Sequence, residues 1–263
     1  MAEEDRAGHD ATQEAGAHAP RSAEPTRHAG EQRHLRSFGR QSGHTLSPSR
    51  QRLVETLLPT LRLDLAQATP AHLARSLFSP PIREVWLEIG FGGGEHLLAQ
   101  ARANPKIGFI GCEPFRNGIA KVLSEIDRGG DKNILLWDDD ARDVVEWIAT
   151  GQLSQCFILF PDPWPKRRHA KRRLVSPAFV KELARSMAPE GRLRFATDIA
   201  DYQRTGLAAI LGSGHFDWTA RSAADWRARP DDWPQTRYER KAIAAGRRCA
   251  FFEFRRRSTR VSS

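Results

Sequence analysis

The feature that most constrains this chain is a regular alternation of short apolar runs and longer amphipathic segments, which starts at Glu84. The apolar runs predict strands over residues 84–89, 107–112, 133–137, 155–160 and 191–196. The segments between them predict helices over 94–103, 115–127, 141–149 and 177–187. Strand followed by helix, repeated in this way, indicates an α/β fold with a doubly wound, mostly parallel sheet and helices on both faces.

The segments on either side of this alternation complete the expected organisation. A helix over 200–211 and strands over 215–219 and 249–255 bring the expected sheet to seven strands. Residues 50–62 and 71–78 have helical spacing of Leu and Val. We therefore expect one folded domain over 49–258 and a flexible C-terminus over 259–263.

The N-terminal segment has a different composition. The first fifty residues carry seven Arg and seven Asp or Glu, with almost no aliphatic side chains. Such a segment cannot bury enough apolar surface to offset its chain entropy, so we expect residues 1–48 to be a disordered tail. Within it, the basic and aromatic patch at 36–40 could order residues 35–48 on RNA, although a purely solvated tail explains the composition as well.

Composition also narrows the class of protein. The net charge of +9 and a pI near 10.1 indicate an anionic partner, for which nucleic acid is the usual candidate. No apolar stretch approaches the roughly 18 residues needed to span a bilayer, so no membrane association is expected. Three widely separated cysteines exclude a disulfide framework and a CxxC zinc site and indicate a reducing, cytoplasmic setting without a metal.

A glycine loop follows the first predicted strand, in the sequence Gly90-Phe91-Gly92-Gly93-Gly94. Glycines at a strand-to-helix turn let the backbone approach a ligand and aim the amides of the helix N-terminus at it. The dinucleotide fingerprint GxGxxG is absent because Glu95 stands three residues after Gly92. With Glu88, the pattern E-x-G-x-G-x-G resembles the S-adenosylmethionine loop of class I methyltransferases. In that class, an acid at this place helps to hold the α-amino group; a ligand-free glycine turn is the alternative for the loop alone.

Acidic residues follow the next two predicted strands as well. Glu113 comes directly after the second strand, where a carboxylate can accept hydrogen bonds from both ribose hydroxyls. The third strand ends in Asp138-Asp139-Asp140, and in class I methyltransferases an acid here faces the adenine amino group. The pattern leaves open which of the three does so. Acids at the ends of three successive strands, beside a glycine loop, predict a cofactor site.

The fourth predicted strand leads into F-P-D-P-W-P-K-R-R-H-A-K-R-R, residues 160–173. Loops at the carboxyl ends of the strands form the active site of open α/β sheets, so Asp162 is expected close to the reacting methyl group. Six of the eight residues from Lys166 to Arg173 are basic, which predicts phosphate contacts; a solvated charged face is the alternative. Trp164 could stack on a base or fill the core.

This run closely resembles the signature of the bacterial tRNA (guanine-N7-)-methyltransferase family. Residues 87–92 match the family's cofactor loop, and Asp140 is favoured among the three acids because it precedes Ala141 as in the family's D-A pair. Further matches are Thr197-Asp198 and the T-R-Y-E run at 236–239, whereas Pro165 stands where the family often has His. The resemblance implies a class I methyltransferase fold, S-adenosylmethionine as cofactor, and tRNA as partner, methylated at N7 of guanosine 46 in the variable loop.

The resemblance also implies roles for individual residues. Asp162 would be the catalytic residue that positions the base. The cofactor contacts would be Glu88, Gly90, Gly92, Glu113, Asp140 and Asp162. The substrate contacts would be Lys166, Asp198, Thr236, Arg237, Tyr238 and Glu239. Asp198 and Glu239 would bind the guanine N1–H and amino group; alternatively, Asp198 caps a helix and Glu239 forms a surface ion pair.

Three other functions compete with this hypothesis. A nicotinamide-dependent oxidoreductase could use the same fold, although the missing third glycine of GxGxxG argues against it. A noncatalytic RNA-binding module would not need the intact loop and the acids at the strand ends. A methyltransferase for another RNA base or a small molecule is the third, and the basic run disfavours the small molecule. The sequence leaves the oligomeric state, monomer or homodimer, open.

Overall fold

A computed structural model describes residues 41, 43–69, 72–79 and 82–258. These residues belong to one compact unit that spans Leu35–Ser263. The segment Met1–His34, most of the predicted tail, the patch at 36–40 and the C-terminal residues 259–263 lie outside the described residues.

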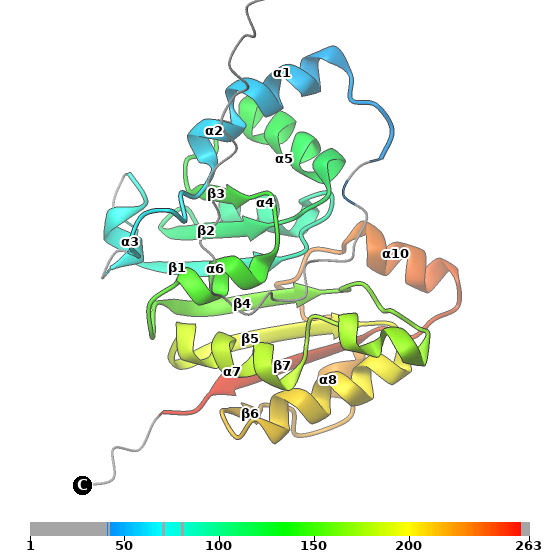
Figure 1. Cartoon of the computed structure of the whole chain (residues 1–263). Coiled ribbons are helices and arrows are strands. Elements are labelled where there is room, and N and C mark those ends of the chain that lie inside the picture. Colours follow the sequence, from blue (N-terminus) through cyan, green and yellow to red (C-terminus); the bar gives the residue numbers. More distant parts are fainter. Residues whose placement is uncertain (1–40, 42, 70–71, 80–81, 259–263) are drawn as a thin grey trace, which may run out of the picture. The chain divides into compact units, whose positions relative to one another are not determined.

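The centre of the unit is a seven-stranded sheet in the order β3-β2-β1-β4-β5-β7-β6 (Figure 1). Its strands are β1 (Glu84–Ile89), β2 (Ile107–Cys112), β3 (Ile134–Trp137), β4 (Leu153–Leu159), β5 (Met187–Thr197), β6 (Phe216–Trp218) and β7 (Ala250–Arg256). The first five strands pair in parallel, whereas β7 pairs antiparallel with both β5 and β6. The chain reverses its order beside β1, which opens a crevice at the carboxyl ends of β1 and β4.

Helices cover both faces of the sheet, as Figure 1 shows. They are α1 (Pro48–Thr56), α2 (Leu58–Leu61), α3 (Leu73–Ser76), α4 (Glu95–Ala103), α5 (Arg116–Gly129), α6 (Ala141–Trp147), α7 (Pro177–Ser186), α8 (Ala200–Gly212), α9 (Ala224–Arg227) and α10 (Arg237–Ala244), with a 3-10 helix η1 (Arg167–Arg172). One apolar cluster joins α4 and α5 to one face through Leu97, Val122 and Phe109. A larger cluster packs α6, α7 and α8 on the other face through Val144, Leu183 and Ile210.

Local sequence explains most of these elements. Every residue of β2 is buried, which fits a central parallel strand covered on both sides. Side chains cap the N-termini of three helices: Asp140 precedes α6, Ser176 precedes α7 and Thr236 precedes α10. The fold class predicted from the alternation of strands and helices is therefore confirmed, including the seven strands.

The helix predicted over 50–62 is divided into α1 and α2, and the one predicted over 71–78 is limited to α3. Two further segments differ from the prediction. β5 begins at Met187, four residues before the predicted start, because the chain crosses an irregular stretch opposite Leu153 and passes through Glu190 with φ of 65°. The basic run folds into η1, which its sequence does not predict, since it lacks apolar residues at helical spacing. No helix within the described residues is long and apolar enough to cross a membrane.

Candidate active site

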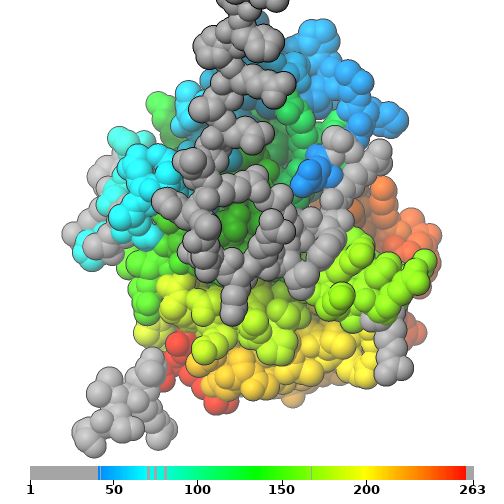
Figure 2. All heavy atoms as spheres, viewed as in Figure 1, coloured from blue at the N-terminus to red at the C-terminus, as the bar shows by residue number. Residues whose placement is uncertain are grey.

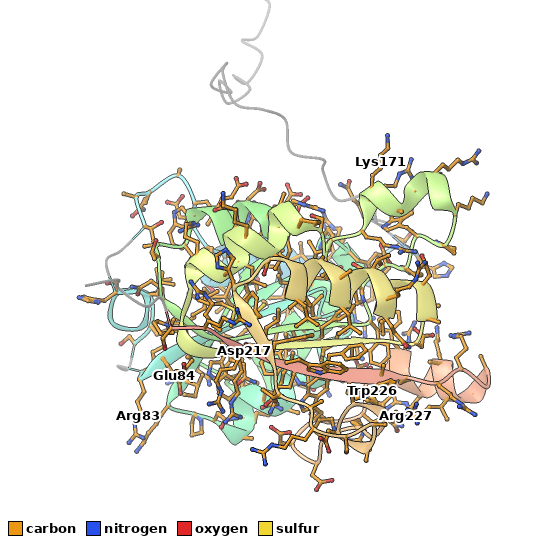
Figure 3. All side chains as sticks on the ribbon, turned by 90° about the horizontal axis from the view of Figure 1, so that it is seen from below. Arg83, Glu84, Lys171, Asp217, Trp226 and Arg227 are labelled. Atoms are coloured by element: carbon orange, nitrogen blue, oxygen red, sulfur yellow. The ribbon has the colours of Figure 1, made fainter. Side chains whose placement is uncertain are left out.

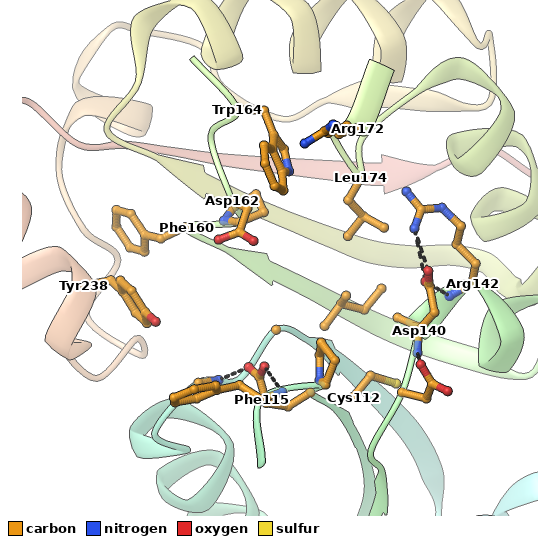
Figure 4. Close-up of a pocket in the computed structure, with 18 of the residues that line it drawn as sticks. Cys112, Phe115, Asp140, Arg142, Phe160, Asp162, Trp164, Arg172, Leu174 and Tyr238 are labelled. Atoms are coloured by element: carbon orange, nitrogen blue, oxygen red, sulfur yellow. Dashed lines mark hydrogen bonds and ion pairs between the residues drawn. The ribbon is translucent and has the colours of Figure 1, made fainter. Parts of the chain in front are cut away.

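A cavity of about 360 Å³ opens where the loops after β1, β2, β3 and β4 converge (Figure 4). It brings together seven of the residues singled out from the sequence, which are Gly90, Gly92, Glu113, Asp140, Asp162, Arg237 and Tyr238. They come from five separate segments of the chain. For the loops after β1 to β4 the convergence follows from parallel pairing, because parallel strands end at the same edge of the sheet. Arg237 and Tyr238 reach the cavity from α10.

The glycine loop is held to the end of β2 by Glu113. The carboxylate of this buried residue accepts a hydrogen bond from the Gly92 N–H at 2.6 Å and another from the Phe115 N–H at 2.9 Å. Gly90 and Gly92 have φ of 76° and 56°, a backbone conformation that favours glycine. Burial raises the pKa of Glu113, and the two backbone N–H groups act in the opposite direction. Glu113 thus shapes the loop as well as facing the cavity.

The acidic triplet divides between two places. Asp138 pairs with Arg62 at 2.6 Å, whereas Asp139 and Asp140 line the cavity. The Asp140 carboxylate accepts hydrogen bonds from the backbone N–H and the guanidinium of Arg142, at 3.0 and 2.9 Å. Asp139 is exposed and accepts a hydrogen bond from the Asp140 N–H at 2.9 Å. Of the three acids, only Asp139 and Asp140 are therefore placed as candidates to face an adenine amino group in the cavity. Asp140 also caps α6.

Asp162 lies on the loop after β4, with its carboxylate directed into the cavity (Figure 4). The loop is unusual because two non-glycine residues, Phe160 and Trp164, have positive φ of 51° and 42°. Such conformations are costly and persist where surrounding contacts enforce them. Although Asp162 is an exposed residue, the neighbouring protein displaces part of its water, and this desolvation raises the pKa of the carboxyl group.

Aromatic and basic side chains from two segments flank the cavity. Trp164 stands on one side, with the guanidinium of Arg172 5.1 Å from its ring centroid. Tyr238 stands on the other, against the glycine loop, where a Cβ on Gly92 would lie 3.0 Å from its ring. The yellow-green residues of η1 and the orange residues of α10 form neighbouring parts of the surface in Figure 2.

Glu88 does not line the cavity, although the resemblance implied that it contacts the cofactor. Its side chain is buried and pairs through Oε2 with His96 Nδ1 at 2.7 Å. The His96 ring lies in edge contact with Phe157, 4.6 Å between centroids. Because successive residues of a strand point to opposite faces, Glu88 turns away from the face that Leu87 and Ile89 share. The acid at the end of β1 is thus part of the core.

The remaining predicted substrate residues do not line the cavity. Asp198 pairs with Arg247, with Oδ2 and Nε 2.5 Å apart, and Glu239 is buried against Arg229, with Oε1 and Nε 3.1 Å apart. Thr236 caps α10 by accepting a hydrogen bond from the Glu239 N–H at 3.2 Å. Lys166 is exposed just before η1. Ion pairing of Glu239 matches one alternative in kind, but Glu239 is itself buried, and its partner Arg229 lies outside α10 rather than on the same helix surface.

Several lining residues had been given no role of their own from the sequence, among them Ile89, Phe115, Arg142 and Leu174. Phe115 and Arg142 each lie two residues beyond an acid at the end of a strand, so their spacing was a usable signal. Ile89 and Leu174 carry no such signal, because an apolar residue at the end of β1 or in the short segment between η1 and α7 is ordinary core composition. Within the described residues, no cluster of His, Cys, Asp and Glu could hold a metal ion.

The strand order, the glycine loop and the acidic residues at the strand ends together define a class I methyltransferase. A 16S rRNA methyltransferase, KamB, has a similar fold, with a TM-score of 0.50 and 14% sequence identity over 73% of this chain and 96% of that protein. At this level of identity the likeness concerns the fold alone.

Sequence relatives specify the family. A family model described as "Putative methyltransferase" matches residues 83–251. The tRNA (guanine-N(7)-)-methyltransferase of Rhodospirillum rubrum is 50% identical over 84% of this chain and 88% of its own length. The enzyme of the same name from Brucella melitensis is 47% identical over 84% of this chain and 94% of its own.

The chain belongs to the tRNA (guanine-N(7)-)-methyltransferase family. This confirms the resemblance inferred from the basic run at 160–173. It also confirms a methyltransferase rather than an oxidoreductase, with S-adenosylmethionine as its cofactor.

Proposed function

We propose that this chain transfers a methyl group from S-adenosylmethionine to N7 of guanosine 46 in the variable loop of tRNA. The observation that carries the proposal is the convergence of Gly92, Glu113 and Asp162 on one cavity between basic and aromatic residues. Membership of the family supports the base and the atom. The tRNA substrate and three free cysteines support the cytoplasm as the compartment.

The residues around the cavity suit the cofactor in kind. The carboxylates of Glu113, Asp139 and Asp140 are acceptors for ribose hydroxyls and for an adenine amino group. Apolar side chains that suit the purine ring are those of Ile89, Phe115 and Leu174. Gly90 leaves the backbone open to close approach, since no atom lies within 4 Å of an added Cβ, whereas the Tyr238 ring lies against Gly92. Glu88, paired with His96, would act on the cofactor through the position of the glycine loop.

When bound, S-adenosylmethionine supplies an electrophilic methyl group that the exposed lone pair of guanine N7 can accept without prior loss of a proton. The task of the protein is then alignment and stabilisation of the positive charge that the purine acquires. Asp162 is suited to both, since its carboxylate faces the cavity in a partly desolvated setting. It needs to be ionised for this role.

We assign the substrate side of the cavity to residues near η1 and α10. Arg237 and Tyr238 line it directly, and Lys166 would hold a nearby phosphate. Thr236 supports them as the cap of α10. Asp198 and Glu239 are our candidates for the guanine N1–H and amino group; their ion pairs with Arg247 and Arg229 would have to be shared with the base.

The deciding experiment is methyl incorporation from labelled S-adenosylmethionine into unmodified tRNA transcripts, followed by borohydride and aniline cleavage at N7-methylguanosine. We expect one cut, at the variable-loop guanosine. A transcript with adenosine at that position is the matched control and should neither incorporate label nor be cut.

Each other outcome contradicts a different part of the proposal. Incorporation without cleavage would retain the methyltransferase and reject N7. Cleavage elsewhere would reject position 46. Tight tRNA binding without incorporation would favour a noncatalytic RNA-binding module.

A further inference from the structure

Arg173 is the last residue of the basic run, and its side chain is buried, unlike the exposed side chains of Lys166, Arg168 and Lys171. Only 4% of Arg173 is accessible to solvent, whereas Lys166, Arg168 and Lys171 are exposed. Figure 3 shows Lys171, two residues earlier, projecting away from the protein. A phosphate contact requires an accessible cation, so the burial of Arg173 calls for another role.

The Arg173 guanidinium connects the loop after β4 to α8. Its Nε donates to the carbonyl of Pro163 at 3.0 Å, and its Nη2 has a longer contact with the carbonyl of Trp164 at 3.5 Å. On the side of α8, Nη1 donates to Thr205 Oγ1 at 2.9 Å and Nη2 pairs with an Asp201 carboxylate oxygen at 2.7 Å. Each of the three guanidinium nitrogens thus contacts a protein group.

The plane of the same guanidinium lies over an aromatic ring. Its central carbon is 5.0 Å from the ring centroid of Tyr202, a fully buried residue of α8. The Tyr202 hydroxyl in turn accepts a hydrogen bond from the Val175 N–H at 3.1 Å. Stacking and hydrogen bonding therefore fix both the position and the orientation of Arg173.

The loop that Arg173 holds is the one that carries Asp162. Pro163 and Trp164 follow Asp162 directly, and the loop contains the two positive-φ residues Phe160 and Trp164. A strained backbone relaxes unless outside contacts hold it. On the other side of Asp162, the Phe160 N–H is held by the Ala196 carbonyl at 2.8 Å. The backbone on both sides of Asp162 is thus held by hydrogen bonds. Ala196 holds the preceding side, and Arg173 holds the following side.

We infer that Arg173 is a positioning residue for Asp162 and takes no part in phosphate binding. The inference rests on the proposed function, since it concerns the rate of that methyl transfer. It divides the basic run into two parts: exposed cations available to RNA, and one buried cation that sets the geometry of the active site.

The test compares Arg173→Met with Lys171→Met, which remove the same charge two residues apart. For Arg173→Met we expect kcat to fall by about tenfold to a hundredfold, as for a small displacement of a catalytic group, with KM for tRNA unchanged. The salt dependence of tRNA binding should also stay at the wild-type value. For Lys171→Met we expect the opposite pattern, a raised KM for tRNA and a shallower salt dependence of binding.

Thr205→Val provides a second variant that leaves Arg173 in place and removes one of its acceptors. Since Val has the shape of Thr, the fold should persist, which a thermal melt can verify. We expect kcat to fall by about twofold to tenfold, the worth of one hydrogen bond, again with KM for tRNA unchanged.

Two results would overturn the inference. One is wild-type kcat in Thr205→Val; the other is an Arg173→Met variant that keeps kcat and binds tRNA with a shallower salt dependence. If Arg173→Met does not fold, Thr205→Val alone decides. Absence of N7 methylation by the wild-type chain would instead reject the proposed function.

Discussion

At the level of single residues, the proposed role of Asp162 and its surroundings favour opposite protonation states of its carboxyl group. Its proposed role requires an ionised carboxylate, yet the protein around it raises the pKa of that carboxyl group by desolvation. A raised pKa in the folded state means that protonation favours folding. This contribution to stability is present below the pKa of an unfolded Asp and is lost as pH rises through the folded-state value.

Asp162→Asn should therefore separate activity from stability. We expect methyl transfer to fall on the order of a hundredfold, because a charged group is lost at the reacting purine. The melting temperature at pH 7 should be unchanged or higher, because Asn carries no charge to desolvate. In the wild type, methyl transfer should decline at a higher pH on acidification than an ordinary Asp would produce. Single-turnover rates and thermal melts across pH provide the measurements.

Asp225→Asn is the control with the opposite sign. The backbone N–H groups of Arg221 and Ser222 donate to this carboxylate and lower its pKa. Its contribution to stability is present above the unfolded-state pKa and is lost as pH falls through the folded-state value. We expect this variant to melt earlier at pH 7 and to keep full activity. Equal melting behaviour of the two Asn variants would contradict the account of Asp162.

Among the elements, the glycine loop between β1 and α4 needs glycine at position 92 for two reasons. One is the left-handed backbone conformation there, and the other is the small space beside the Tyr238 ring. Gly92 has φ of 56°, and an added Cβ would lie 3.0 Å from the Tyr238 ring. Gly130 has φ of 66° at the end of α5, with no atom within 4 Å of an added Cβ. The two positions share the backbone constraint but differ in their neighbours.

Ala substitutions at these positions should separate the two effects. Both Gly92→Ala and Gly130→Ala should lower the free energy of unfolding by about 1–2 kcal/mol, the cost of the left-handed conformation. Gly92→Ala alone should also weaken S-adenosylmethionine binding by about tenfold or more, since it displaces Tyr238 and the Glu113 hydrogen bond. Denaturant melts and calorimetric titration measure the two quantities. Equal cofactor affinity in both variants would contradict a ligand-binding role for the loop.

At the scale of the whole molecule, charge is distributed unevenly over a chain with a net charge of +9. Exposed cations precede and occupy η1 beside the cavity, whereas Arg83 lies at the opposite end of the molecule from Lys171 in Figure 3. If phosphates bind beside the cavity, the location of a charge should matter more than its number.

The salt dependence of tRNA affinity tests this directly. We expect steep weakening as salt rises, and Lys166→Gln with Arg168→Gln should reduce the slope of log K against log salt by about two. Arg83→Gln should leave the slope unchanged despite the same loss of charge per residue. Filter binding over a range of salt concentrations provides the measurement. A slope that changes equally in all variants would contradict a defined RNA-binding face.

Local signals in the sequence were sufficient for most of the fold. The runs at 84–89 and 107–112 form strands with the predicted bounds, because continuous apolar residues between helices describe buried parallel strands well. The glycine loop, Glu113 and Asp162 also reach one cavity as predicted, since each follows a strand and parallel strands end together. These features depend on residues that are close in sequence.

Tertiary structure alone decided the direction and the partners of individual side chains. Glu88 turns into the core toward His96, Arg173 turns inward toward α8, and Glu239 pairs with Arg229. The sequence around a charged residue does not show which partner will neutralise that residue when it is buried, because the partner comes from a separate segment. Sequence by itself thus determined the fold and the loops that form the site; packing determined which of their charges face the ligand and which hold the loops in place.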